Sequence, residues 1–183
     1  MAEFKEFEKI PRLNRPVIIT EKLDGTNACV VVEEGESGLF EDRLVFAQSR
    51  NRIITVDSDN YRFAKWVEDN KETLKQLGPG YHYGEWWGRG IQRDYGLTEK
   101  RFSLFNTSRW KDARPACCHV VPILSIWNGF GKVEEIIEKL RAEGSIAAPG
   151  FMDPEGIIMY HAAAQHYFKV TIKGDESPKG KQA

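Results

Sequence analysis

Residues 21–27 place a lysine, an acid and a glycine in a short turn between two apolar runs. A lysine in a turn whose flanking strands start and end in the core is held rigid and partly dehydrated. These conditions lower the pKa of its amine and make it a nucleophile. Asp24 and Gly25 supply the tight turn, in which Gly25 can take positive φ. The segment therefore indicates Lys22 as a nucleophile, with an ordinary Asp-Gly hairpin beside a surface lysine as the alternative.

The elements that would position this turn are mostly strands. Apolar and aromatic runs predict strands over residues 17–21, 27–34, 46–48, 81–87, 102–105, 120–127, 156–161 and 167–172. Strand segments predominate and do not alternate regularly with helices. This pattern favours an α+β fold with antiparallel sheets.

Two segments carry apolar residues at helical spacing. One helix is expected over residues 60–77, with a capping side chain among residues 57–59 and a stop at Gly78-Pro79-Gly80. The second is expected from about Lys132 to Ala142. Residues 174–183 are polar and rich in Gly, Pro and Lys, which predicts a loose, flexible tail.

Composition limits the class of protein. The chain has 183 residues, enough for one well-buried domain, and its net charge of −1 gives no global basic signal for nucleic acid. It has no apolar run long enough to span a bilayer and no signal-peptide pattern. Cys29, Cys117 and Cys118 make an odd count, so we expect reduced thiols in a cytoplasmic protein. Cys117-Cys118-His119 lacks a second ligand pair for zinc.

Six segments resemble motifs of one enzyme superfamily. Lys22-Leu23-Asp24-Gly25-Thr26-Asn27 resembles the Lys-x-Asp-Gly-x-(Asn or Arg) motif of the covalent nucleotidyltransferases. These enzymes are the ATP-dependent DNA and RNA ligases and the mRNA capping enzymes. The other five segments follow in the expected order: Gln48–Arg52, Tyr83–Gly88, Phe102–Asn106, Pro154–Met159 and Phe168–Lys173. One such match is weak, but chance matches would not keep this order.

With Asn27 at its last position, the first motif resembles that of the RNA ligase 2 branch. DNA ligases and capping enzymes usually carry Arg at that position. The resemblance implies two antiparallel sheets flanked by helices with ATP between them, and Mg²⁺ or Mn²⁺ as a cofactor. It implies an ATP-dependent RNA ligase that forms lysyl-AMP, adenylates an RNA 5′-phosphate and joins it to a 3′-hydroxyl. Such ends could belong to a nicked duplex, a hairpin loop or single strands. The alternatives are a DNA nick ligase, a capping-type enzyme and a non-catalytic nucleotide-binding relative.

The resemblance also assigns roles to individual side chains. Lys22 would attack the α-phosphorus of ATP. Arg50 would contact a phosphate or the ribose, or bind the 5′-phosphate of the RNA, unless it is a solvated arginine at a strand end. Glu85 would contact the ribose hydroxyls or a metal-bound water, although a structural acid paired with an arginine is the alternative. Phe105 would stack on adenine unless it is a core phenylalanine. Glu155 would be the metal ligand unless it is a plain turn residue.

The terminal motif departs from the family pattern. The family often places its second lysine two residues after the first, but Thr171 follows Lys169 at that spacing and Lys173 lies four residues on. Strand alternation would place all three on one face. The expected catalytic residues are Lys22, Glu85, Lys169 and Lys173. The expected nucleotide-binding residues are Glu21, Asp24, Gly25, Asn27, Arg50, Glu85, Phe105, Lys169 and Lys173.

The resemblance covers a nucleotidyltransferase domain over residues 1–173, and we expect no second C-terminal domain after it. A small core of this kind suits a phage or bacterial genome. RNA would then be bound by the core itself, by a partner or by a surface of basic and aromatic residues. That surface would combine Arg89, Arg93, Lys100, Arg101, Arg109, Lys111 and Arg114 with Trp86, Trp87, Tyr95 and Trp110. The alternative is a solvated charged face beside core aromatic residues.

Overall fold

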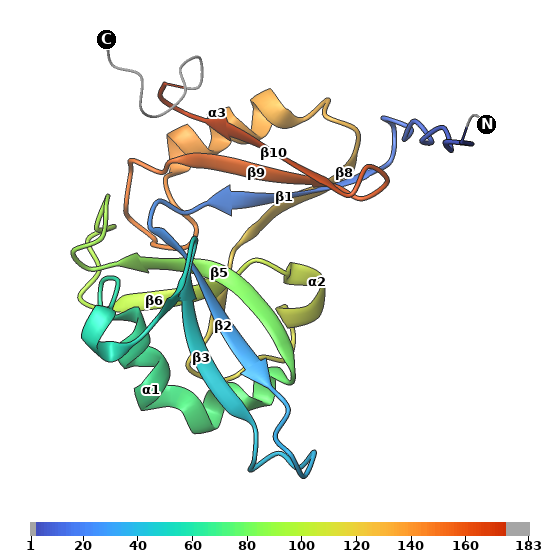
Figure 1. The fold of residues 1–183 in the computed structure, drawn as a ribbon. Coiled ribbons are helices and arrows are strands. Elements are labelled where there is room, and N and C mark those ends of the chain that lie inside the picture. The colour runs from blue at the N-terminus through green and yellow to red at the C-terminus, as the bar shows by residue number, and fades with distance from the viewer. Residues whose placement is uncertain (1–2, 175–183) are drawn as a thin grey trace.

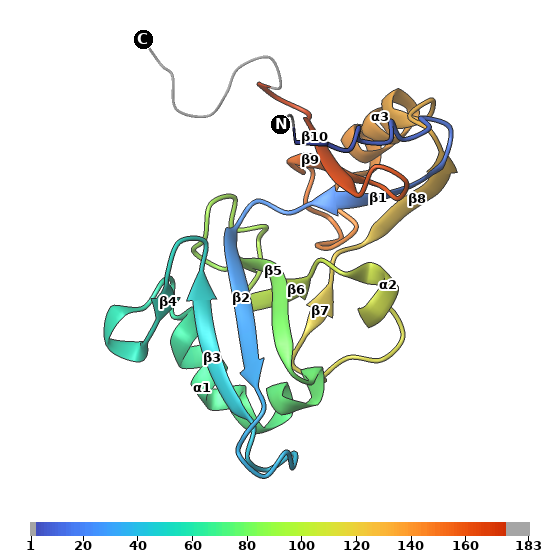
Figure 2. The same cartoon turned by 45° about the vertical axis from the view of Figure 1, so that its right-hand side comes forward.

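Two β-sheets meet at the segment that carries Lys22 in the computed structural model, which describes residues 3–174 (Figures 1 and 2). The four-stranded sheet has the order β10-β9-β1-β8, formed by β1 (Pro16–Lys22), β8 (Ile123–Asn128), β9 (Gly156–His161) and β10 (His166–Thr171). The six-stranded sheet has the order β4-β3-β2-β5-β6-β7. Its strands are β2 (Thr26–Glu33), β3 (Leu44–Ser49), β4 (Ile53–Ile54), β5 (Gly80–Gly88), β6 (Lys100–Leu104) and β7 (His119–Val120).

Each sheet is covered by one long helix. Helix α1 (Phe63–Leu74) packs on the six-stranded sheet, and α3 (Val133–Glu143) packs on the four-stranded sheet (Figure 1). The short helix α2 (Thr107–Trp110) follows β6, and single 3₁₀ turns span Val56–Ser58 and Lys75–Leu77. All strand pairs are antiparallel except β6 with β7. The predicted α+β class with two antiparallel sheets is therefore confirmed.

Side-chain alternation separates a core face from a second face on each sheet. In the six-stranded sheet, Val30, Trp86 and Phe102 belong to the apolar cluster that packs against α1. In the four-stranded sheet, Ile19 and Ile157 pack with α3. The residues that alternate with these along each strand therefore point to the opposite face of their sheet. These two opposite faces lie toward each other where the sheets meet.

The lysine turn is not a hairpin. β1 pairs with β8 and β9, whereas β2 pairs with β3 and β5, so residues 23–25 cross from one sheet to the other. Gly25 does not need a positive φ, contrary to the expectation for an Asp-Gly turn. A Cβ atom at Gly25 would lie 2.4 Å from the Trp86 carbonyl oxygen, so close approach to β5 is what requires glycine there.

The predicted strand over residues 120–127 is wrong, because the structure divides it between the sheets. β7 ends at Val120 and β8 begins at Ile123. Pro122 lies in the gap and has no N–H for a ladder, while its carbonyl oxygen accepts a hydrogen bond from the Glu21 N–H at 3.0 Å. Proline therefore marks the second crossing between the sheets.

The other predicted elements differ only at their ends. The first helix begins at Phe63 rather than residue 60, and its last predicted turn is 3₁₀. Asp59 is the capping side chain, because its two carboxylate oxygens accept hydrogen bonds from the Ala64 and Lys65 N–H groups at 2.7 and 2.9 Å. Residues 175–183 of the predicted tail lie outside the described part. Within residues 3–174, no helix combines the length and apolar character needed to cross a membrane.

Candidate active site

A cleft of about 980 Å³ lies between the two sheets. β1, β9 and β10 line one side, and β2, β3, β5 and α2 line the other. Among the predicted site residues, the lining includes Glu21, Lys22, Asn27, Arg50, Glu85, Phe105 and Lys169. Ligand sites typically occupy about 300–1,000 Å³, so this cleft is at the large end of that range.

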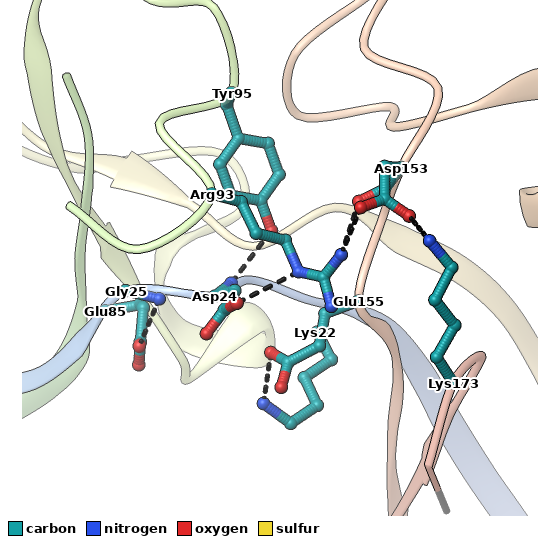
Figure 3. Close-up of polar contacts among 9 residues, drawn as sticks. All are labelled: Lys22, Asp24, Gly25, Glu85, Arg93, Tyr95, Asp153, Glu155 and Lys173. Atoms are coloured by element: carbon teal, nitrogen blue, oxygen red, sulfur yellow. Dashed lines mark hydrogen bonds and ion pairs between the residues drawn. The ribbon is translucent and has the colours of Figure 1, made fainter. Parts of the chain in front are cut away.

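Lys22 and Glu155 form an ion pair beside residues 23–25, the segment that crosses between the sheets (Figure 3). Lys22 is opposite Gly156 in the β1–β9 ladder, which brings Glu155 beside its ammonium group. The Glu155 side chain is only 2% exposed, whereas that of Lys22 is 19% exposed. Glu155 is therefore a buried carboxylate facing the Lys22 ammonium group, not a plain turn residue.

Gly156 makes this approach possible. It has φ of +152°, and a Cβ atom there would lie 2.1 Å from the Val170 carbonyl oxygen. No side chain fits between β9 and β10 at this point. The Glu-Gly pair is thus explained by packing, since the glycine lets β10 approach and the glutamate points to Lys22.

Glu85, a residue of β5, binds the lysine turn through its carboxylate. Its carboxylate accepts hydrogen bonds from the Gly25 N–H at 3.0 Å and from the Asn27 side-chain amide at 3.1 Å. Burial raises the pKa of Glu85 to about 7, and the negative charge of Glu155 adds to the increase, while Lys22 and both hydrogen bonds oppose it. The partner of Glu85 is thus the turn itself, not the arginine that a purely structural acid would require.

A chain of charged groups connects the turn to the four-stranded sheet (Figure 3). Arg93 Nε donates to Asp24 Oδ2 at 2.9 Å, and its Nη1 donates to Asp153 Oδ2 at 2.6 Å. Lys173 Nζ donates to the other Asp153 oxygen at 2.6 Å. The Asp24 N–H also donates to the Tyr95 hydroxyl at 2.8 Å. Both sheets are therefore tied together beside Lys22.

Sequence reasoning missed Asp153 and the role of Arg93 and Tyr95 in this network. Their loop has left-handed backbone at Gln92 and Tyr95, with φ of 47° and 58°. Such conformations are unusual for residues other than glycine and mark a segment held by its surroundings. Asp94, which lies between them, is also left-handed with φ of 62° and is a type that favours this conformation, but Gln92 and Tyr95 are not, so residue type does not signal the geometry at these two positions.

Glu21 lines the cleft, but its carboxylate is used elsewhere. It is 1% exposed and accepts hydrogen bonds from the Ser145 hydroxyl and from the Ile146 and Ala147 N–H groups. Burial raises its pKa, against the opposing effect of these bonds. The side chain therefore attaches the segment after α3 to β1 and is not offered to a ligand.

Lys169 and Lys173 occupy different places. Lys169 is an exposed residue of β10 that lines the cleft. Lys173 lies beyond the end of β10, is 71% exposed and pairs with Asp153, outside the cleft lining. The expectation that both lysines reach the nucleotide stays a prediction, and the geometry favours Lys169.

Two exposed side chains complete the predicted set. Arg50 is exposed at the end of β3 and lines the cleft. Phe105 is 38% exposed and also lines the cleft, so it is not a core phenylalanine.

The predicted aromatic RNA surface is wrong. Its aromatic members are all buried, with exposures of 7% or less: Trp86, Trp87, Tyr95 and Trp110. The alternative holds for these residues, since they are core aromatic side chains beside a charged face. Any stacking surface for bases must use other rings.

The residues around Lys22 fit a divalent cation held mainly by phosphates. Among residues 3–174, no group of three or more acidic, histidine or cysteine side chains could hold a metal ion by itself. Glu155 nevertheless places a buried carboxylate beside Lys22, and the Glu85 carboxylate binds the Gly25 N–H three residues further along the chain. Mg²⁺ commonly uses one or two carboxylates together with substrate phosphates, and this pair matches that donor set.

Comparison with known proteins identifies the family. Residues 15–171 match the family model described as RNA ligase. A mutant of the Naegleria gruberi RNA ligase with ATP and Mn has 19% identity and a TM-score of 0.65, over 88% of this chain and 51% of that one. Another mutant of that ligase, with AMP and Mn, has 20% identity and a TM-score of 0.62, over 87% and 50%.

The same ligase with PPi has 21% identity and a TM-score of 0.61, over 86% of this chain and 50% of that one. The chain thus spans about half the length of these solved relatives. The search of curated proteins gives no match. Because the family model matches most of its length, the chain belongs to the RNA ligase family.

Proposed function

We propose that the chain is an ATP-dependent RNA ligase that acts through a covalent lysyl-AMP. The observation that carries this proposal is the position of Lys22 at the crossing between the sheets, paired with Glu155 and facing a cleft of nucleotide size. Membership of the RNA ligase family supports the reaction class. The related Naegleria gruberi structures with ATP or AMP and Mn support the choice of nucleotide and metal.

In the first step, Lys22 Nζ loses a proton and attacks the α-phosphorus of ATP. A phosphorus–nitrogen bond forms, and the bond to pyrophosphate breaks. Positioning and charge neutralisation supply most of the rate of such transfers. Lys169 and Arg50 line the cleft and would contact phosphate oxygens, and Phe105 would stack on adenine. Mg²⁺ or Mn²⁺ beside Glu155 would supply the positive charge that offsets the phosphates.

Glu85 and Asn27 maintain the turn through this step. Their hydrogen bonds fix the Gly25 N–H and the Asn27 amide relative to β5, so Lys22 approaches from a rigid segment. In the second step, an RNA 5′-phosphate oxygen displaces the lysine and takes AMP. In the third, a 3′-hydroxyl attacks that phosphate and releases AMP, which closes the phosphodiester bond.

The test is incubation with α-labelled ATP and Mg²⁺, then denaturing separation. Label should remain on the protein and move to a 5′-phosphorylated RNA when one is added. Labelling by GTP instead of ATP would indicate a capping-type enzyme, and preference for DNA ends would indicate a DNA ligase. No label with either Mg²⁺ or Mn²⁺ would contradict the proposal and favour a nucleotide-binding module. Cytoplasmic location and action on nicked duplexes stay predictions.

A further inference from the structure

Two tyrosines of β5 are exposed inside the cleft and have no structural role in the core. Tyr81 and Tyr83 are 60% and 55% exposed, and both line the cleft. Their rings are stacked, with centroids 6.2 Å apart and an interplanar angle of 15°. Neither hydroxyl makes a hydrogen bond to a side chain or backbone group within residues 3–174. Adjacent large aromatic side chains exposed on a sheet are typical of a binding surface.

The pair continues the face that carries Glu85. Alternate residues of a strand share a face and rise about 3.3 Å per residue, so Tyr83 lies about 7 Å and Tyr81 about 13 Å from Glu85 along β5. Phe105 lies beside Tyr83, because its N–H donates to the Tyr83 carbonyl at 3.0 Å. The aromatic row therefore leads away from the lysine turn along the cleft.

The same cleft contains cations without carboxylate partners. Arg50, Arg109 and Lys169 line it, and none of them makes an ion pair with another residue in the range 3–174. The two acids of the lining, Glu21 and Glu85, have carboxylates held by hydrogen bonds within the protein. With Lys22 the lining has four cations against these two acids, so its formal charge is positive, which suits a phosphodiester backbone.

We infer that Tyr81 and Tyr83 form a stacking platform for unpaired bases of the RNA strand whose ends are joined. Aromatic rings on an open sheet face bind RNA by stacking on bases that have left their helix, with cationic side chains on the phosphates. Bases inside a duplex have both faces covered and cannot use such a platform. The inference rests on the proposed function and specifies its substrate: RNA with single-stranded nucleotides at the reacting end.

The platform is distinct from the proposed adenine contact. Phe105 is the residue assigned to ATP, whereas Tyr81 is the ring of this row that lies farthest from Glu85 along β5. Removal of Tyr81 should therefore affect RNA steps and leave lysine adenylation unchanged. This difference separates a platform for RNA from an extension of the ATP site.

The experiment compares Tyr81→Ala, Tyr83→Ala and the double variant with Tyr81→Phe and Tyr83→Phe, which keep the rings. Tyr61→Ala is the positional control, because Tyr61 is 47% exposed and does not line the cleft. Affinity for a fluorescent single-stranded RNA oligomer with a 5′-phosphate is measured by anisotropy. Self-labelling with ATP and AMP transfer from pre-labelled protein to the same oligomer are measured separately.

We expect each alanine variant to weaken binding of the oligomer about 5-fold or more, and to slow AMP transfer to it, given the usual contribution of base–aromatic stacking. The phenylalanine variants and Tyr61→Ala should resemble the wild type, and self-labelling should change less than about 2-fold. Transfer to a fully paired nicked duplex should be affected less than transfer to the single strand. Thermal unfolding of each variant checks that it is folded.

Unchanged affinity and transfer in the double variant would overturn the platform. So would a higher ATP requirement for self-labelling with normal RNA steps, since the tyrosines would then serve ATP. The anisotropy measurement does not need catalysis. Absence of self-labelling in the wild type would therefore reject the proposed ligase reaction while RNA binding still reports on the platform.

Discussion

The two ends of the cleft are built in opposite ways. At the lysine end, buried acids and a charged chain fix every group: Glu85 holds the turn, Glu155 faces Lys22, and Arg93 connects Asp24 to Asp153. At the tyrosine end, Tyr81 and Tyr83 are more than half exposed. Covalent chemistry requires reacting atoms held to a fraction of an ångström, whereas a flexible strand requires accessible faces. Under the proposed function, the contrast separates the end of the cleft where bonds change from the end where RNA is held.

Lys22→Ala should produce the largest effect, complete loss of covalent labelling by ATP, because no other amine occupies the crossing between the sheets. Lys65→Ala is the matched control, since Lys65 is a half-buried lysine of α1 that pairs with Asp69, away from the cleft. Denaturing gel separation after reaction with labelled ATP measures both. Label that persists on the Lys22 variant would show that the nucleophile lies elsewhere. The lysine end of the cleft would then not differ from the tyrosine end as the place of covalent chemistry.

Glu85→Gln should change how stability depends on pH. The pKa of Glu85 is raised from 4.5 to about 7, so its favourable contribution is complete below about pH 4.5 and is lost as pH rises to 7. A shift of this size corresponds to about 3 kcal/mol in the free energy of unfolding. Urea denaturation across this range should show a smaller decline in the variant.

Glu21 also has a raised pKa through burial, so a residual decline is expected in Glu85→Gln. Glu99→Gln is the control, because Glu99 is an exposed acid that pairs with Arg101. If Glu85→Gln and Glu99→Gln lose stability with pH as the wild type does, Glu85 is not the buried acid that titrates near neutrality. The Glu85 carboxylate would then contribute less to the rigidity of the lysine end of the cleft than we infer.

Arg93→Ala should reduce the rate of self-labelling about 10-fold, because small displacements of reacting groups are costly. The variant removes the link between Asp24 and Asp153 but leaves Lys22, Glu155 and the tyrosines in place. Arg89→Ala is the control from the same loop, since the Arg89 side chain donates to the Thr98 carbonyl and not to Asp24 or Asp153. Single-turnover labelling is the measurement. RNA affinity that falls while labelling is normal would assign Arg93 to the substrate instead.

Lys173→Ala should have the smallest effect, less than about 2-fold on self-labelling. Its pair with Asp153 is exposed, and exposed pairs contribute little to stability. Lys169→Ala is the comparison, with a loss of more than about 10-fold expected from the removal of a cleft cation. Equal losses for both lysines would restore the original expectation that each contacts the nucleotide.

Much of the site was predictable from short segments. Lys22 is indicated by its local pattern, Glu155 and Gly156 by the resemblance to the superfamily motif, and the structure brings Lys22 and Glu155 into contact. Asp59 was one of the proposed caps for the first helix, and the limits of most strands are within two residues of those expected. These features depend on neighbours close in sequence, where spacing and residue type carry the information.

Other features required the tertiary structure. The sequence could not show whether Trp86, Trp87 and Trp110 are buried or exposed, because alternating aromatic residues fit either face of a sheet. The link from Asp24 through Arg93 to Asp153 joins positions about 70 and 130 residues apart in sequence. It depends on left-handed backbone at Gln92 and Tyr95 that no residue pattern predicts.

The sequence by itself determined the α+β class and the order of the motifs and indicated Lys22 as the candidate nucleophile, because hydrophobic periodicity and local turn chemistry reside in adjacent residues. Only the tertiary structure decided that β1 and β2 belong to different sheets, so that the lysine turn is a crossing and not a hairpin. It alone showed which aromatic rings are open to the cleft. Sheet assignment and exposure arise from contacts between segments distant in sequence, and such contacts leave no mark in any one segment.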